Sequence, residues 1–160
     1  MTPTVPPEGL SLQVGSATGH PGERVIIAVT LHTAGEDVVA TENRILLDAR
    51  APIATRSNRP DCTVNPEIDK DSATFAFFPP GCVSTASCEL ARAIVISFGN
   101  SDPIPPGSVL YTCAVDIAPT ATPGEVVPLV CTEPVASGPR GEFLVPACID
   151  GEIRVAAQGQ

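Results

Sequence analysis

The chain has 160 residues, which is long enough for one domain with a substantial core and too short for two of ordinary size. Its 18 prolines and 13 glycines favour many turns and oppose long helices. Nine Lys and Arg stand against 18 Asp and Glu, so the net charge of −9 argues against nucleic acid or an anionic membrane surface as a partner.

The two ends of the chain differ in composition from its middle. Residues 1–9 contain three prolines and predict the end of a Pro/Thr-rich linker. We expect one domain over residues 10–155 and a flexible tail over residues 156–160. No stretch approaches the run of about 20 apolar residues that spans a bilayer. The first residues also lack the basic and apolar regions of a secretion signal.

Apolar residues alternate with polar ones along most of the chain, as half-buried antiparallel strands require. This alternation predicts strands at residues 10–15, 24–32, 43–49, 73–78, 91–98, 108–117, 125–131 and 148–155, with a ninth near 51–56 or 142–146. By parity, the inward side chains are Phe75 and Phe77, then Ile94, Ile96 and Phe98, then Val109, Tyr111, Cys113, Val115 and Ile117. The sequence therefore predicts an all-β sandwich of two antiparallel sheets, a fold that more often presents surfaces than performs chemistry.

Six cysteines lie at positions 62, 82, 88, 113, 131 and 148, and no pair has the C-x-x-C spacing of zinc or redox sites. Six reduced thiols, packed as small hydrophobes, are one reading. An even count with wide spacing favours three disulfides and an oxidising, extracellular setting. Cys82 and Cys88 would meet across a hairpin. Cys113 with Cys131, on the inward register of consecutive strands, is the next pairing, which leaves Cys62 with Cys148.

Several segments, in this order, resemble the cohesin modules of bacterial cellulosomes and cell-surface proteins. They are Gly19-His-Pro-Gly-Glu-Arg-Val-Ile-Ile-Ala-Val29, Thr41-Glu-Asn-Arg-Ile-Leu-Leu, Ala93-Ile-Val-Ile-Ser, Ile104-Pro-Pro-Gly-Ser-Val-Leu-Tyr and Asp150-Gly-Glu-Ile-Arg-Val. The resemblance spans residues 10 to 155. It implies a nine-stranded jelly-roll sandwich that binds a dockerin module through one sheet face and carries out no catalysis. Where cohesins commonly have Asn and Asp on the third strand, this chain has Glu42 and Arg44.

If one face is used as in cohesins, parity predicts which side chains form it. The predicted partner-binding residues are Glu42, Arg44, Leu46, Thr74, Phe78, Ala93, Val95 and Val130. Leu46, Phe78, Val95 and Val130 would form an apolar patch with Glu42 and Arg44 at its rim, which suits a protein interface. The alternatives are that a loop covers this patch, or that a strand register is off by one residue and inverts its assignments.

Other sites have weaker support in the sequence. Glu67-Ile-Asp-Lys-Asp71 and Asn100-Ser-Asp102 offer oxygen ligands of the kind calcium prefers, but a solvated turn and a rigid connector explain them without a metal. The histidines, His20 and His32, lie beside no nucleophile motif, so we expect neither an enzyme nor a cofactor.

Two non-enzymatic alternatives to dockerin binding remain open. A carbohydrate-binding module needs exposed aromatic rings that stack on sugars. The chain has no Trp, its only Tyr lies on the expected core face, and Phe78 is the one plausible platform. A structural spacer in a cell-surface adhesin is also compatible with the sequence.

Overall fold

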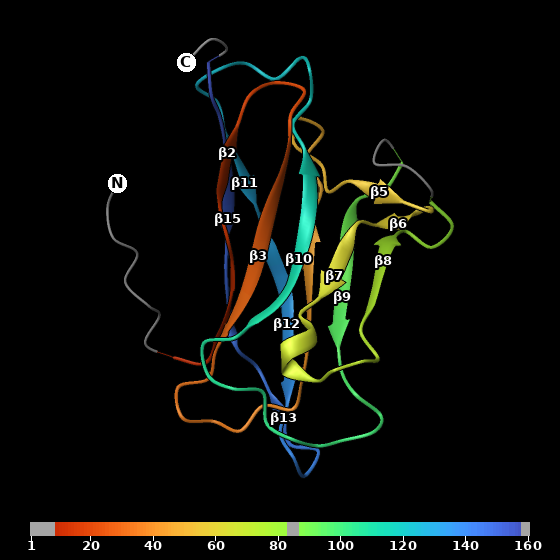
Figure 1. Ribbon diagram of the computed structural model, residues 1–160, viewed down its shortest axis with the longest axis vertical. Helices are drawn as coiled ribbons and strands as arrows, with labels where there is room; N and C mark the ends of the chain where they lie inside the picture. The colour runs from red at the N-terminus through yellow and green to blue at the C-terminus, as the bar shows by residue number, and fades with distance from the viewer. Residues whose placement is uncertain (1–8, 83–86, 158–160) are drawn as a thin grey trace.

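The protein is an all-β sandwich with a jelly-roll arrangement of strands, as the sequence predicted (Figure 1). The computed structural model describes residues 9–82 and 87–157. The first sheet has the strand order β14 (Ala147–Ile149), β1 (Ser11–Val14), β3 (Arg24–His32), β10 (Val109–Asp116) and β7 (Cys62–Val64). The second sheet has the order β13 (Phe143–Leu144), β12 (Cys131–Ser137), β4 (Ala40–Leu46), β9 (Leu90–Val95) and β8 (Thr74–Phe78).

Smaller elements accompany the two main sheets. A third sheet has the order β11 (Val126–Leu129), β15 (Gly151–Val155) and β2 (Ala17–Gly19). The hairpin β5 (Thr55–Arg56) and β6 (Arg59–Pro60) lies beside β8, and a short 3-10 helix, η1 (Pro66–Ile68), follows β7. The sheets are not purely antiparallel as expected, because β1 pairs with β14, and β15 with β2, in parallel.

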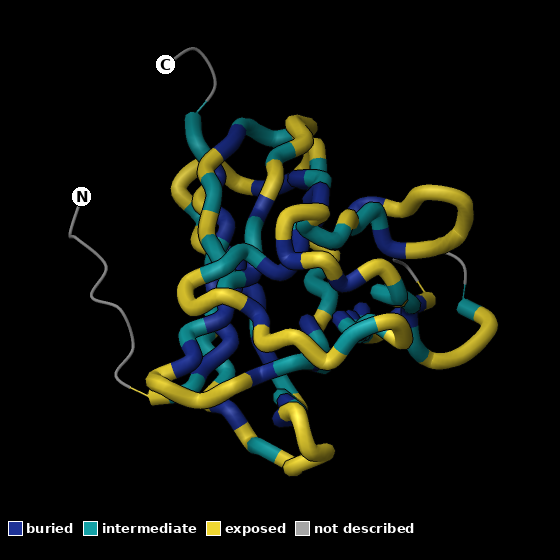
Figure 2. The backbone as a smooth tube through the Cα atoms, turned by 60° about the horizontal axis from the view of Figure 1, so that its bottom comes forward, coloured by how far each residue is buried: buried dark blue, intermediate teal, exposed yellow. Residues whose placement is uncertain are grey.

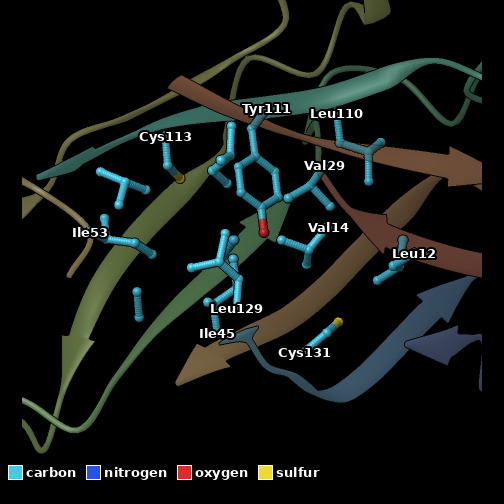
Figure 3. Close-up of a cluster of buried hydrophobic side chains, with 14 of the residues drawn as sticks. Leu12, Val14, Val29, Ile45, Ile53, Leu110, Tyr111, Cys113, Leu129 and Cys131 are labelled. Carbon is cyan, nitrogen blue, oxygen red and sulfur yellow. The ribbon is translucent and has the colours of Figure 1, made fainter. Parts of the chain in front are cut away.

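The core lies between the two main sheets and is built on Tyr111 of β10. Its ring is fully buried, points toward Ile45 and Leu129 (Figure 3), and packs on Phe75 with ring centroids 5.3 Å apart. The Tyr111 hydroxyl donates a 2.9 Å hydrogen bond to Asn43 Oδ1, so both buried polar groups are satisfied. Burial raises the pKa of Tyr111 and keeps the phenol neutral. Figure 2 shows burial along the chain: buried segments gather in the middle of the molecule, and exposed segments form loops at its periphery.

The strictly alternating segments fold as predicted. The segment expected at 24–32 is β3, those expected at 73–78 and 108–117 contain β8 and β10, and the inward positions of Phe77, Tyr111, Cys113, Val115 and Ile117 are buried. Both candidate sites for an extra strand contain a short one: β5 lies in 51–56 and β13 in 142–146.

Strand β12 was not predicted, because Glu133 and Pro134 interrupt its alternation. The structure places a register shift between Thr132 and Val135, with Glu133 at a positive φ of 48°. A bulge leaves residues outside the ladder, so the missing N–H of Pro134 costs no sheet hydrogen bond. The strand predicted at 125–131 contains β11, which pairs with β15 in the third sheet and is not part of the second.

The six cysteines form three disulfides. Cys82–Cys88 is confirmed, but the other two expected pairings are wrong. Cys62 lies directly opposite Cys113 on the neighbouring strand, with Cα atoms 4.1 Å apart, and bonds to it. Cys131 begins β12 and bonds to Cys148 of β14. The short strand β7, which sequence alternation did not reveal, brings Cys62 to Cys113.

The expected linker and tail stay predictions. Residues 1–8 and 158–160 lie outside the described part of the chain. At the C-terminal end, the Ala156 N–H still donates a 2.7 Å hydrogen bond to the Gly19 carbonyl, so the ordered sheet continues one residue past β15.

Candidate protein-binding face

The outward side of the second sheet is a continuous surface crossed by rows of side chains from β12, β4, β9 and β8. Strand register and alternating burial define three rows. The first row is Val130, Leu46, Leu90 and Phe78; the second is Thr132, Arg44, Arg92 and Ala76; the third is Val135, Glu42, Ile94 and Thr74. We call these twelve residues the outer face.

Six of the eight predicted partner-binding residues are on this outer face. Glu42, Arg44, Leu46, Thr74 and Phe78 point outward from β4 and β8. Val130 lies between β11 and β12, and its carbonyl accepts a 3.0 Å hydrogen bond from the Leu46 N–H, which sets it beside Leu46. Their role in binding remains a prediction, but the fold does bring them together.

The predicted exposure of Ala93 and Val95 is wrong. Their side chains are 5% and 0% exposed and belong to the core. Small side chains are needed at Ala91 and Ala93, because these residues and the Tyr111 ring line the same narrow space between the sheets. Strand β9 therefore turns Leu90, Arg92 and Ile94 outward. The expected inward positions of Ile94, Ile96 and Phe98 are wrong as well: Ile94 and Ile96 are half-buried, and Phe98 is 87% exposed. Arg92 was the missed signal: the predicted register would have buried an arginine beside Ile94, at a high desolvation cost.

Arg44 and Arg92 occupy the middle of the outer face, directly opposite each other on β4 and β9. Arg92 Nε donates a hydrogen bond to Glu42, and Arg44 Nε lies 3.0 Å from Glu133 Oε2. Both guanidinium groups also contact the ring of Phe78, with Cζ to centroid distances of 5.4 and 5.9 Å. The centre of the face is thus charged and aromatic.

Apolar side chains lie on both sides of this charged centre. Leu46, 40% exposed, forms the first row with Leu90, Val130 and Phe78. On the other side, Ile94 and Val135 flank Glu42, and Phe143 of β13, 71% exposed, extends the surface beyond β12. The expected apolar centre with a charged rim is therefore inverted.

Several potential catalytic groups come together at another place, but their geometry gives no catalytic chain. Ser16, His32 and Asp150 line one open hollow of about 640 Å³. The Ser16 hydroxyl accepts from the Glu152 N–H, His32 Nε2 is bonded to Gln13 Oε1, and Asp150 accepts from the Cys131 N–H. No hydrogen bond among the residues described joins any two of the three, so the nucleophile–base contact that activates a serine is missing.

The two oxygen-rich segments considered for calcium fold against each other around Lys70. Its buried ammonium donates 2.8 Å hydrogen bonds to Asn100 Oδ1 and to the Asp102 carbonyl. Asn100 in turn donates to the Asp69 carbonyl, and Ser97 to Asp71. Burial lowers the pKa of Lys70, while Asp102 and Asp69 oppose that change. An internal cation therefore holds these oxygen groups together.

Residues 9–82 and 87–157 contain no group of three or more His, Cys, Asp or Glu that could hold a metal ion. They also contain no helix long and apolar enough to cross a membrane.

Comparison with solved structures identifies the fold as that of cohesin modules. A cohesin from Clostridium acetobutylicum, solved in solution, superposes with a TM-score of 0.72 at 19% identity, covering 95% of this chain and 94% of that one. A non-cellulosomal cohesin from the archaeon Archaeoglobus fulgidus gives 0.68 at 13% identity, covering 94% of each chain.

A third cohesin, from ScaC of Acetivibrio cellulolyticus and solved in complex with the ScaB dockerin, gives a TM-score of 0.73 at 16% identity, covering 92% of this chain and 99% of that one. No protein-family model matches the chain, and no curated protein sequence matches it. At these identities the comparisons show the fold, and the expected cohesin-like sandwich is confirmed.

Proposed function

We propose that this domain is an extracellular, non-catalytic protein-binding module that binds a dockerin through the outer face. The observation that carries the proposal is the combination of a cohesin fold with an exposed sheet face of mixed character. One of the similar structures was solved with a dockerin bound to its cohesin. The three disulfides support an oxidising, extracellular location.

The outer face has the composition of an interface that binds protein rather than sugar. It combines half-buried aliphatic side chains with arginine and an aromatic ring, which are enriched in protein interfaces. A sugar-binding platform needs a ring with a free face. The ring expected for that role, Phe78, already packs against Arg44 and Arg92.

Isothermal titration calorimetry against dockerins encoded in the same genome tests this proposal. Leu46→Arg places a charge in the first row of the outer face and should weaken binding by at least about thirtyfold. Ile26→Arg is the matched control, because Ile26 is an exposed aliphatic residue (59%) on β3 of the other sheet. Failure of every dockerin to bind the folded domain, or equal losses in both variants, would count against the proposal. Retention on insoluble cellulose, chitin or xylan would favour the carbohydrate alternative.

A further inference from the structure

Two like charges face each other at the centre of the outer face without an acid between them. Arg44 and Arg92 are direct cross-strand partners, an arrangement that destabilises a sheet when left uncompensated. The two compensating carboxylates lie to the side: Glu42 contacts Arg92, and Glu133, in the β12 bulge, contacts Arg44. The pair is therefore balanced in total charge but open in the middle.

The guanidinium groups keep donors available for a ligand. Each Arg has five N–H donors, and the contact to Glu42 or Glu133 is made through Nε. The terminal nitrogens of both side chains make no hydrogen bond to any residue in the described part of the chain. With side-chain exposures of 29% and 32%, the two groups are partly desolvated and still reachable from outside.

The two side chains are also held in place before any ligand arrives. Both guanidinium groups pack on the same Phe78 ring, which keeps them together rather than spread into solvent. The ion pairs of Arg44 with Glu133 and of Arg92 with Glu42 restrict the two side chains further. Because little side-chain freedom remains to be lost on binding, such a pair gains affinity from each hydrogen bond it forms.

The geometry points to a specific chemistry in the partner. We propose that the protein bound by the outer face presents an Asp or Glu side chain to Arg44 and Arg92, whose forked donors match a carboxylate. This inference rests on the proposed function in taking the outer face as the binding surface. The apolar side chains on both sides, among them Leu46 and Ile94, fit a protein surface around that carboxylate rather than a free anion.

A random dodecapeptide phage library tests the inference without any known partner. Because the domain carries a net charge of −9, nonspecific attraction favours basic peptides, so acidic ones must be selected by a local site. Peptides recovered on the wild-type domain should be enriched in Asp and Glu, and the double variant Arg44→Gln/Arg92→Gln should lose that enrichment.

The matched control is Arg24→Gln/Arg154→Gln, which removes the same charge from two ion-paired arginines on other sheets and should keep the enrichment. If Arg44→Gln/Arg92→Gln unfolds, the single variant Arg44→Gln, which keeps the Arg92–Glu42 ion pair, is used in its place. Absence of acidic enrichment on the wild-type domain, or the same enrichment on the central variant, overturns the inference.

Calorimetry separates this result from that of the proposed function. For a dockerin that binds, Arg44→Gln/Arg92→Gln should weaken affinity about tenfold to a hundredfold, as should changing the contacting acid of the dockerin to its amide. Acidic enrichment without any dockerin binding would reject the dockerin and keep the carboxylate chemistry. If a dockerin binds and its affinity changes neither with the two arginines nor with any acid of the dockerin, the dockerin proposal is kept and the carboxylate chemistry is rejected.

Discussion

Removing the three disulfides one at a time should destabilise the domain in the order of the loops that they close. Cys62–Cys113 joins residues 51 apart, Cys131–Cys148 residues 17 apart, and Cys82–Cys88 residues 6 apart. In the chain-entropy treatment, a cross-link limits the unfolded chain more when its loop is longer. The relation gives losses in unfolding free energy of about 4, 3 and 2 kcal/mol for the three paired Cys→Ala variants.

Urea unfolding at neutral pH measures these losses. The domain has no Trp and a single Tyr, so far-ultraviolet circular dichroism and Tyr111 emission are the two available probes. A non-reducing digest of the wild-type protein should first show a peptide pair joined through Cys62 and Cys113. Equal losses in all three variants, or the largest loss in Cys82→Ala/Cys88→Ala, would refute the loop-length reasoning.

Three further predictions concern packing, pH and metal binding. Gly151→Ala should lower the free energy of unfolding by close to the upper end of about 1–3 kcal/mol, because the new Cβ would lie 2.0 Å from the Gly15 carbonyl oxygen. The control Gly99→Ala, at an exposed position, should change it by under about 0.5 kcal/mol in the same thermal or urea unfolding. Hydrogen bonds from Arg50 lower the pKa values of Asp48 and Glu125, so these acids stabilise the fold above their unfolded pKa values of 3.8 and 4.5, and that stabilisation is lost as the pH falls through the lowered values. The difference in unfolding free energy between wild type and Arg50→Gln should therefore be largest at neutral pH and disappear in acid. A difference that stays constant with pH would contradict this coupling. Calcium should leave the melting temperature unchanged, because the Lys70 ammonium already binds the Asn100 and Asp102 oxygens. Lys70→Met should lower the free energy of unfolding by about 1–3 kcal/mol. A clear rise in melting temperature with calcium would contradict this assignment.

Where alternation is strict and one face is clearly apolar, the sequence predicted the strands well. β3 has the predicted bounds, and β4 and β8 turn the predicted residues outward. β4 and β8 supply half of the outer face, six of its twelve residues: Glu42, Arg44, Leu46, Thr74, Ala76 and Phe78. Period-two patterns work there because only one parity buries the apolar side chains.

The remainder of the face depended on contacts between distant segments. In β9, both parities are apolar over Ala93–Val95, so these residues alone do not select one; in the fold, small alanines face the Tyr111 ring. In β12, the bulge at Glu133 and Pro134 changes parity within one strand. The cysteine pairing likewise required β7 to lie beside β10, which no local pattern indicates. Arg92 was a usable signal, since a charged residue identifies the outward parity.

Amide hydrogen–deuterium exchange of the domain, free and saturated with a dockerin found to bind it, is the most direct measurement of where such a partner binds. Binding should slow exchange in β4 and β9, residues 40–46 and 90–95, and leave β3, residues 24–32, unchanged. Slower exchange confined to β3 and β10 would contradict the assignment of the outer face. So would a saturated complex that leaves β4 and β9 as they are in the free domain.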